Sequence, residues 1–178
     1  MSAKKARPRL SVRLMVMVAI LTAMQIVLSR FLSYMVWNQK IGFAFVPVVL
    51  AGMLFGPLAG ALVGGLSDFI GAILFPIGAY FPGFTLTAAL TGAVFGWLLY
   101  KRQSLCRVCI AVLFNQLVLG LVVNSFWIAV LYGSSYVGLL GSRLIQYAIM
   151  VPVEIVVTWV LIKALQPVMA QLKQKRNG

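Results

Sequence analysis

The sequence holds very few of the side chains that carry metal or acid–base chemistry. Its 178 residues include no histidine, two carboxylates and two cysteines. The cysteines, Cys106 and Cys109, have no further cysteine or histidine with which to complete a zinc site. General acid–base catalysis usually needs a tunable partner, and only Asp68 and Glu154 are available. We therefore expect a protein that is not an enzyme and that uses no metal and no cofactor.

Charged residues of either sign are also scarce, and this excludes a water-soluble fold. They make up 10% of the chain, against about 25% in soluble domains. Hydrophobic residues make up 62%, and the mean hydropathy is +1.03. A helical membrane span takes roughly 20 residues, so the chain has room for five or six spans. We predict an all-α integral membrane protein that forms a single domain over residues 1–178.

Charges and turn signals divide the chain into six predicted spans. The turn signals are Gly56-Pro57, the stretch 76–83 and Gly133-Ser134-Ser135. The spans are expected at residues 14–29, 42–55, 58–75, 84–100, 108–132 and 139–165, with basic tails at 1–13 and 166–178. The second span is short for a membrane and contains Pro47, so we expect it to be accommodated by local thinning or to be partly unwound.

The distribution of Lys and Arg predicts the orientation. Six spans place both chain ends on one side, and every cation except Arg30, Lys40 and Arg143 falls on that side. Cations collect in cytoplasmic segments, so both termini are expected in the cytoplasm. The net charge of +13 is thereby assigned to contacts with membrane lipid, and we expect no nucleic-acid partner.

The two carboxylates are the first functional candidates. Asp68 and Glu154 both lie inside predicted spans, where an acidic side chain costs about 2.5–3.5 kcal/mol on insertion scales. Such residues face a protein interior or an aqueous cavity and commonly mark functional sites. A purely structural carboxylate that caps neighbouring polar groups is the alternative for both. The role of Glu154, which lies nearer the cytoplasmic side, is left open.

Aromatic, amide and cationic residues gather near the predicted outer ends of the spans. Together with one central carboxylate they suit a flat heteroaromatic solute with an acidic tail: the carboxylate accepts ring N–H groups, aromatic faces stack, and cations bind carboxylates. An interfacial aromatic belt is the structural alternative. The candidate binding residues are Asp68, Arg30, Trp37, Lys40, Phe81, Phe84, Asn124, Trp127, Arg143 and Gln146.

Small residues recur at four-residue spacing in three places. This spacing lets helix backbones approach closely. We assign the series that contain Gly60, Gly64 and Gly92 to packing inside the bundle. Ala19 and Ala23, on the first helix, are candidates for contact with another membrane subunit.

Two stretches of sequence resemble a known family. SDFIGAILFPIGAYFPGFTLTA at residues 67–88 and IGFAFVP at 41–47 are similar to the folate-type substrate-binding (S) components of energy-coupling factor (ECF) vitamin transporters. The resemblance implies six helices in the bacterial plasma membrane and folate binding from outside. It also implies association with an ECF transmembrane coupling subunit, through Ala19 and Ala23, and with two cytoplasmic ATPase subunits. The chain itself has no G-x-x-x-x-G-K-[ST] phosphate loop.

The resulting prediction is a folate-specific S component. Asp68 would pair with the pterin, Phe84 and Trp127 would stack on it, and the three outer cations would bind the glutamate carboxylates. Alternatives remain. They are an S component for a queuosine precursor or another vitamin, a self-sufficient facilitator that works as a homo-oligomer, and a membrane enzyme such as a lipid-modifying transferase.

Overall fold

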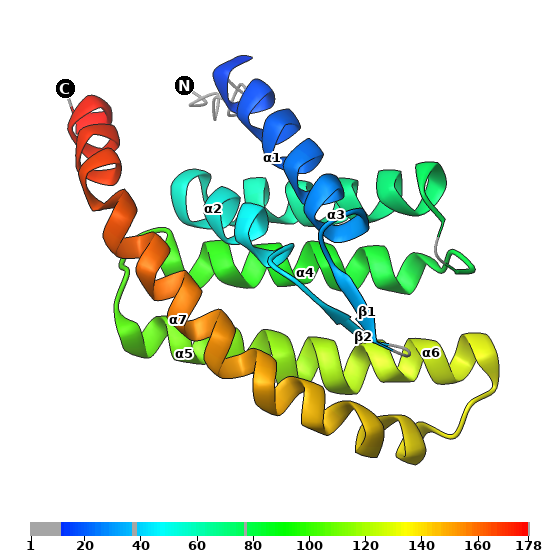
Figure 1. The fold of residues 1–178 in the computed structure, drawn as a ribbon. Coiled ribbons are helices and arrows are strands. Elements are labelled where there is room, and N and C mark those ends of the chain that lie inside the picture. The colour runs from blue at the N-terminus through cyan, green and yellow to red at the C-terminus, as the bar shows by residue number, and fades with distance from the viewer. Residues whose placement is uncertain (1–11, 37–38, 77, 178) are drawn as a thin grey trace, which may run out of the picture.

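The protein is a helical bundle with one short β-hairpin. The computed structural model describes residues 12–36, 39–76 and 78–177. In order, the elements are α1 (Val12–Arg30), β1 (Tyr34–Val36), β2 (Gln39–Ile41), α2 (Phe45–Phe55), α3 (Pro57–Leu74), α4 (Pro82–Leu99), α5 (Leu105–Leu113), the π-helix η1 (Phe114–Val123), α6 (Asn124–Tyr132) and α7 (Tyr136–Asn177) (Figure 1). Because α5, η1 and α6 follow one another without a break, they form one continuous rod.

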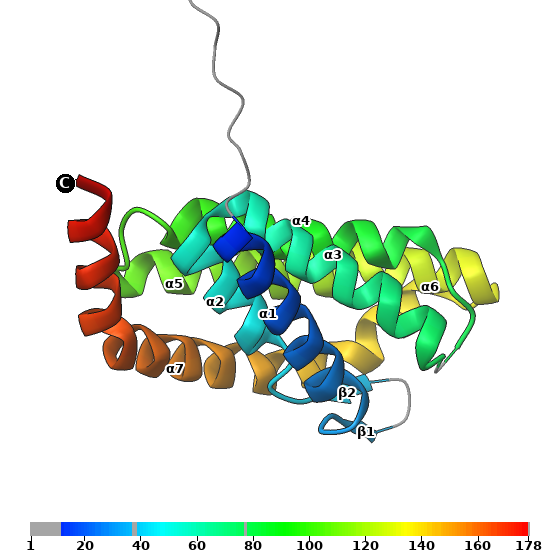
Figure 2. The same ribbon diagram turned by 90° about the horizontal axis from the view of Figure 1, so that it is seen from above.

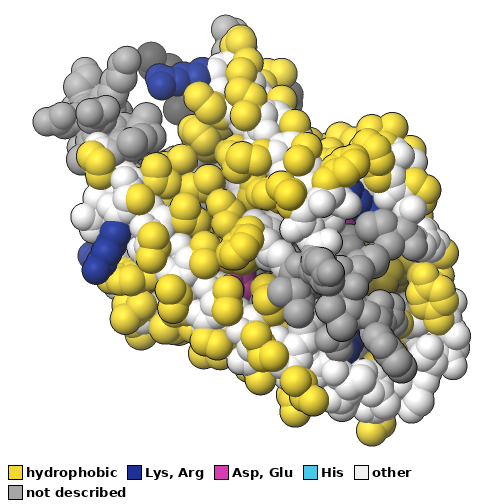
Figure 3. All heavy atoms as spheres, in the orientation of Figure 1, with side chains coloured by type: hydrophobic (Ala, Val, Ile, Leu, Met, Phe, Trp, Pro, Cys, Tyr) yellow, Lys and Arg dark blue, Asp and Glu magenta, His cyan; other side chains and the backbone are white. Residues whose placement is uncertain are grey.

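The helices have the length and composition of membrane spans, as predicted. Among the described residues, five helical segments are long and apolar enough to cross a bilayer, and α2 is a shorter apolar helix. Large hydrophobic side chains cover the outside of the bundle, and the face drawn in Figure 3 is mostly apolar. Trp97 and Val137, for example, are 76% and 77% exposed. Such a surface is suited to lipid, and the all-α membrane class is confirmed.

The structure differs from the predicted layout in three details. Residues 166–177, expected as a tail, continue α7 as helix, with Pro167 inside it. The first loop contains the antiparallel β1–β2 hairpin, which the sequence did not indicate. The fifth span is helical over its whole length, but ten of its residues adopt π geometry in η1. The basic residues at 1–11 lie outside the described part of the chain.

The second span is short, as expected, and its helix begins late. Residues 42–44 precede α2 without regular helical structure, and the helix has 11 residues. Pro47 lies in the first turn, where its missing N–H removes no helical hydrogen bond. The unwound stretch therefore joins the hairpin to the bundle rather than interrupting a helix.

The helices α3 and α4 and the rod of α5, η1 and α6 run along one direction, and α1 crosses them obliquely (Figures 1 and 2), so the bundle has two distinct ends. The start of α1 and the end of α7 lie at the same end, on the left in Figure 1, and we call this the terminal end. The loops 75–81 and 133–135 lie at the opposite end, which we call the loop end (Figures 1 and 2). The start of α1 and the end of α7 thus lie nearer each other than either lies to the loop end.

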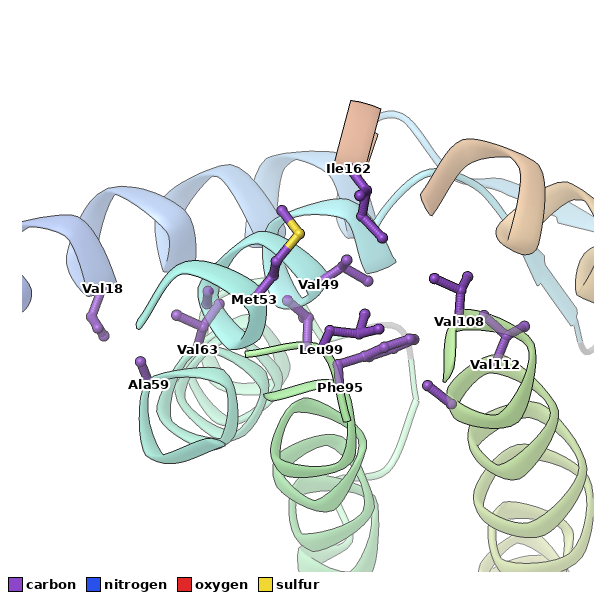
Figure 4. Packing of buried hydrophobic residues seen from close by; sticks show 13 residues of the cluster. Val18, Val49, Met53, Ala59, Val63, Phe95, Leu99, Val108, Val112 and Ile162 are labelled. Carbon is purple, nitrogen blue, oxygen red and sulfur yellow. The ribbon is translucent and has the colours of Figure 1, made fainter. Parts of the chain in front are cut away.

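An apolar core fills the half of the bundle near the terminal end. Its fully buried members come from the parts of α2, α3, α4, α5 and α7 that lie nearest that end. Figure 4 shows Met53, Val49, Phe95 and Leu99 meeting between these helices. This core does not extend into the loop-end half of the same helices, so polar groups can lie between the helices there.

Glycines bring α3 and α4 into direct backbone contact. A Cβ atom built on Gly92 would overlap the carbonyl of Gly60, and one built on Gly60 would overlap the carbonyl of Gly92. Gly64 meets the carbonyl of Ala88 in the same way. The prediction that these glycines serve packing inside the bundle is confirmed.

Gly92→Ala is expected to destabilise the protein. The added methyl group would force the two backbones apart, and overpacking of this kind costs about 1–3 kcal/mol. Gly141→Ala is the matched control, because no atom lies within 4 Å of a Cβ built on Gly141. Alanine is favoured over glycine inside a helix by about 0.5–1 kcal/mol, so this variant should melt at or above the wild-type temperature. Equal melting temperatures for the two variants in detergent would contradict the close contact.

Candidate functional site

A cavity of about 460 Å³ occupies the loop-end half of the bundle. Small-molecule sites commonly measure about 300–1,000 Å³. Side chains from α1, α3, α4, η1, α6 and α7 line the cavity, together with the loop 75–81. Its polar lining consists of charged, amide and hydroxyl groups: Arg30, Asp68, Arg143, Gln116, Asn124, Gln146, Tyr80, Thr87, Thr91, Tyr132 and Tyr147.

Asp68 is tied to α4 and to the loop that follows α3. The Thr85 hydroxyl donates a hydrogen bond of 2.8 Å to Asp68 Oδ2. The Thr85 and Tyr80 hydroxyl oxygens lie 3.3 Å apart, and the Tyr80 ring meets Phe69 edge-on at 5.9 Å. These contacts hold the carboxylate in place at the side of the cavity.

Arg30, the last residue of α1, lies across the backbone of α3. A Cβ atom on Gly71 would lie 3.1 Å from Arg30 Nε, so the guanidinium lies in tight contact with the α3 backbone at this glycine. Arg30 and Asp68 carry opposite charges and line the same cavity. Among the described residues, the buried Nε of Arg30 has no hydrogen-bond partner. Arg30 therefore has donor capacity to offer a bound molecule.

Arg143 approaches the cavity from α7. Its Nη1 donates to Ser125 Oγ at 3.3 Å, and its guanidinium carbon lies 5.9 Å from the centre of the Tyr147 ring. Its Nε and the Oδ1 of Asn124 are buried without a partner in the described part of the structure. A buried polar atom without a partner costs about 1–3 kcal/mol, so a ligand that bonds to these atoms would gain affinity.

Aromatic residues form a second layer behind part of the cavity lining. Trp127 Nε1 donates to Thr87 Oγ1 at 3.1 Å, and the indole packs on Phe81 with ring centres 5.4 Å apart. Phe81 in turn packs on Phe84 at 6.2 Å. Phe84 and Thr87 line the cavity, whereas Phe81 and Trp127 are not part of its lining. Gly83 makes this arrangement possible, since a Cβ there would lie 2.6 Å from both rings.

Six of the ten predicted binding residues line one cavity. They are Arg30, Asp68, Phe84, Asn124, Arg143 and Gln146. Phe81 and Trp127 lie behind that lining. Trp37 and the side chain of Lys40 lie outside the described part of the chain.

The sequence analysis did not select several residues that line the cavity, among them Tyr147 and Gln116. Tyr147 follows Arg143 by one helical turn, and this spacing could have identified it. Gln116 lies in the π-helix η1, where helical spacing does not predict which residues face inward.

Glu154 lies behind the cavity rather than in its lining. The carboxylate is 2% exposed and accepts a hydrogen bond from Nε2 of Gln116, which lines the cavity. The described residues contain no group of three or more Cys, Asp or Glu that could hold a metal ion. The groups that line the cavity can form hydrogen bonds, pair with charges and stack on an aromatic ring.

A family model agrees with this architecture. The model described as ECF transporter, substrate-specific component, matches residues 13–162. The chain belongs to this family. As an S component, it is a multi-pass protein of the bacterial cell membrane and a transporter component, which excludes the membrane-enzyme alternative.

Individual relatives cover most of this S component. It is 40% identical over 149 residues to the folate transporter FolT of Clostridium novyi (strain NT), an alignment that covers 83% of this chain and 87% of the relative. It is 32% identical over 162 residues to FolT of Leuconostoc mesenteroides, with 87% of each chain covered. The crystal structure of FolT bound with folic acid superposes with a TM-score of 0.80 at 33% identity, covering 85% of this chain and 93% of that one.

Proposed function

We propose that this S component binds folate and delivers it to an ECF-type importer. The observation that carries the proposal is the charge content of the cavity, in which one carboxylate and two guanidinium groups share a space with the Phe84 ring. Folate is complementary to this set, because its pterin offers N–H donors and its glutamate carries two carboxylates. The folate transporters among its relatives, and the fold shared with FolT bound with folic acid, support this assignment.

Each part of the ligand has a proposed partner. Asp68 accepts N–H groups of the pterin, and Phe84 stacks on the ring. Arg30 and Arg143 bind the glutamate carboxylates, and Lys40 is a further candidate for this role. Trp127 contributes indirectly, because its Nε1 donates a hydrogen bond to the hydroxyl of Thr87, which lines the cavity.

The partner surface is proposed on α1. Ala19 and Ala23 are both exposed, and the buried residues of α1 are Val18 and Thr22. We assign this surface to the ECF transmembrane coupling subunit, and the energy of transport to two cytoplasmic ATPase subunits.

With both termini in the cytoplasm, the cavity at the loop end would face outward. The exposed cations Lys101 and Arg102 in the loop at the terminal end agree with that orientation.

Ligand binding and uptake test the proposal separately. The purified chain is expected to bind folic acid selectively in a calorimetric titration, with no displacement by unrelated vitamins or queuosine precursors. In liposomes, the chain alone should not import labelled folate, and import should require the coupling subunit, the ATPases and ATP. Selective displacement by another vitamin would indicate an S component of different specificity. Uptake by the chain alone would indicate a facilitator.

A further inference from the structure

A buried polar pair at the deep end of the cavity has no role in the function proposed so far. Gln116, on η1, lines the cavity, and Glu154, on α7, lies behind it with 2% of its surface exposed. On α7, Arg143 lies 11 residues before Glu154. The helical rise over this distance places Arg143 about 16 Å closer to the loop end than Glu154. The pair therefore lies well below the guanidinium of Arg143, at the floor of the cavity.

The hydrogen bond between the two side chains has a direction. Nε2 of Gln116 donates to a carboxylate oxygen of Glu154. An ionised carboxylate can only accept hydrogen bonds, whereas a glutamine amide donates from its nitrogen and accepts at its oxygen. With the nitrogen engaged by Glu154, the Oε1 atom of Gln116 is the polar atom of this lining residue that is left for another partner.

The free-energy cost of placing Glu154 inside a membrane span indicates that the direction of its hydrogen bond with Gln116 has a function. A carboxylate inside a membrane span is unfavourable by about 2.5–3.5 kcal/mol, and well-packed hydrophobic residues often replace buried charges without loss of stability. A glutamine at position 154 could also bond to Gln116, but it would permit both orientations of the amide. An ionised carboxylate accepts and does not donate, so Glu154 fixes the orientation of the amide while it is ionised.

We propose that Glu154 is a positioning residue that holds Gln116 as a hydrogen-bond acceptor toward the ligand. The floor of the cavity then selects a ligand that presents an N–H donor there. This inference rests on the proposed folate function, since the pterin supplies such donors. It gives the site a second acceptor, on a different helix from Asp68, for the same donor-rich ring.

The test distinguishes the direction of the hydrogen bond between Gln116 and Glu154 from its mere presence. Glu154→Gln preserves the volume and the mutual hydrogen bond but lets the amide of Gln116 turn, so we expect folic acid to bind about tenfold more weakly. The exchanged pair, Gln116→Glu with Glu154→Gln, restores an acceptor facing the cavity. It is expected to bind folic acid at least fivefold more tightly than Glu154→Gln alone, in titrations of the purified chain.

A control removes both polar groups together. In the double variant Gln116→Leu with Glu154→Leu, both polar groups are removed, so no buried polar atom is left without a partner. This variant should melt near the wild-type temperature and yet bind folic acid at least tenfold more weakly. Wild-type affinity in Glu154→Gln or in the leucine pair would overturn the proposal. So would an exchanged pair that folds but binds no better than Glu154→Gln; if the exchanged pair does not fold, the leucine pair decides. A wild-type chain that does not bind folic acid would contradict the proposed function instead.

Discussion

Asp68→Asn is expected to weaken folic acid binding by about 100-fold. The asparagine keeps the size of the side chain, and its carbonyl can still accept the hydrogen bond from Thr85. Its second group, however, is an N–H donor that faces the N–H donors of the pterin. Hydrogen bonds to a charged group contribute about 1.5–3 kcal/mol each, so loss of a paired contact is sufficient for this effect. Isothermal titration calorimetry of the purified variant measures it directly.

Thr85→Val is the matched control for Asp68. It removes the hydroxyl that holds Oδ2 but leaves the carboxylate itself. We expect a loss of tenfold or less, because Asp68 can still accept N–H groups once the ligand orders it. Both variants should be checked for an unchanged melting temperature. Wild-type affinity in Asp68→Asn would remove this residue from the pterin site.

Arg30→Gln combined with Arg143→Gln is expected to lower folic acid affinity by at least 100-fold. Both guanidinium groups line the cavity, and each has a buried Nε without a partner in the described structure. If they bind the glutamate carboxylates, the loss should depend on ligand charge. The diamide of folic acid, whose two carboxylates are neutralised, should bind wild type and double variant within about threefold. Competition titrations with the two ligands measure this dependence.

Arg102→Gln is the control for general loss of positive charge. Arg102 is exposed in the loop between α4 and α5, at the opposite end of the bundle from the cavity. Its replacement should leave both ligands unaffected. Equal losses for folic acid and for its diamide in the arginine double variant would show that Arg30 and Arg143 support the cavity structurally and do not bind the carboxylates.

The spans and the charged part of the cavity could be predicted because their signals are local. Apolar length, charges and turn signals together place all six predicted spans within three residues of the observed helices, except for the end of α7. Asp68 is conspicuous because a carboxylate is costly in lipid. Arg30 and Arg143 are conspicuous because the positive-inside rule does not explain them. These three residues line the same cavity.

The remaining features depend on helix rotation and on contacts between distant segments. The π geometry of η1 changes which residues of the fifth span face inward, and this places Gln116 beside Glu154. Trp127 and Phe81 lie near the expected site but do not line the cavity. Trp127 is hydrogen-bonded to Thr87 and Phe81 packs on Phe84, so both lie behind these two lining residues. The hairpin arises from pairing between residues such as Tyr34 and Ile41, without a short turn motif to indicate it.

The backbone contact between α3 and α4 has a mechanical consequence. The backbones of α3 and α4 touch at Gly60 and Gly92, so no side chain lies between them there that could change rotamer to absorb a displacement. They supply Asp68, Phe84 and Thr87 to the same cavity. Two backbones in direct contact therefore hold these three ligand-facing residues at a fixed spacing, and a bound molecule meets them as one rigid surface.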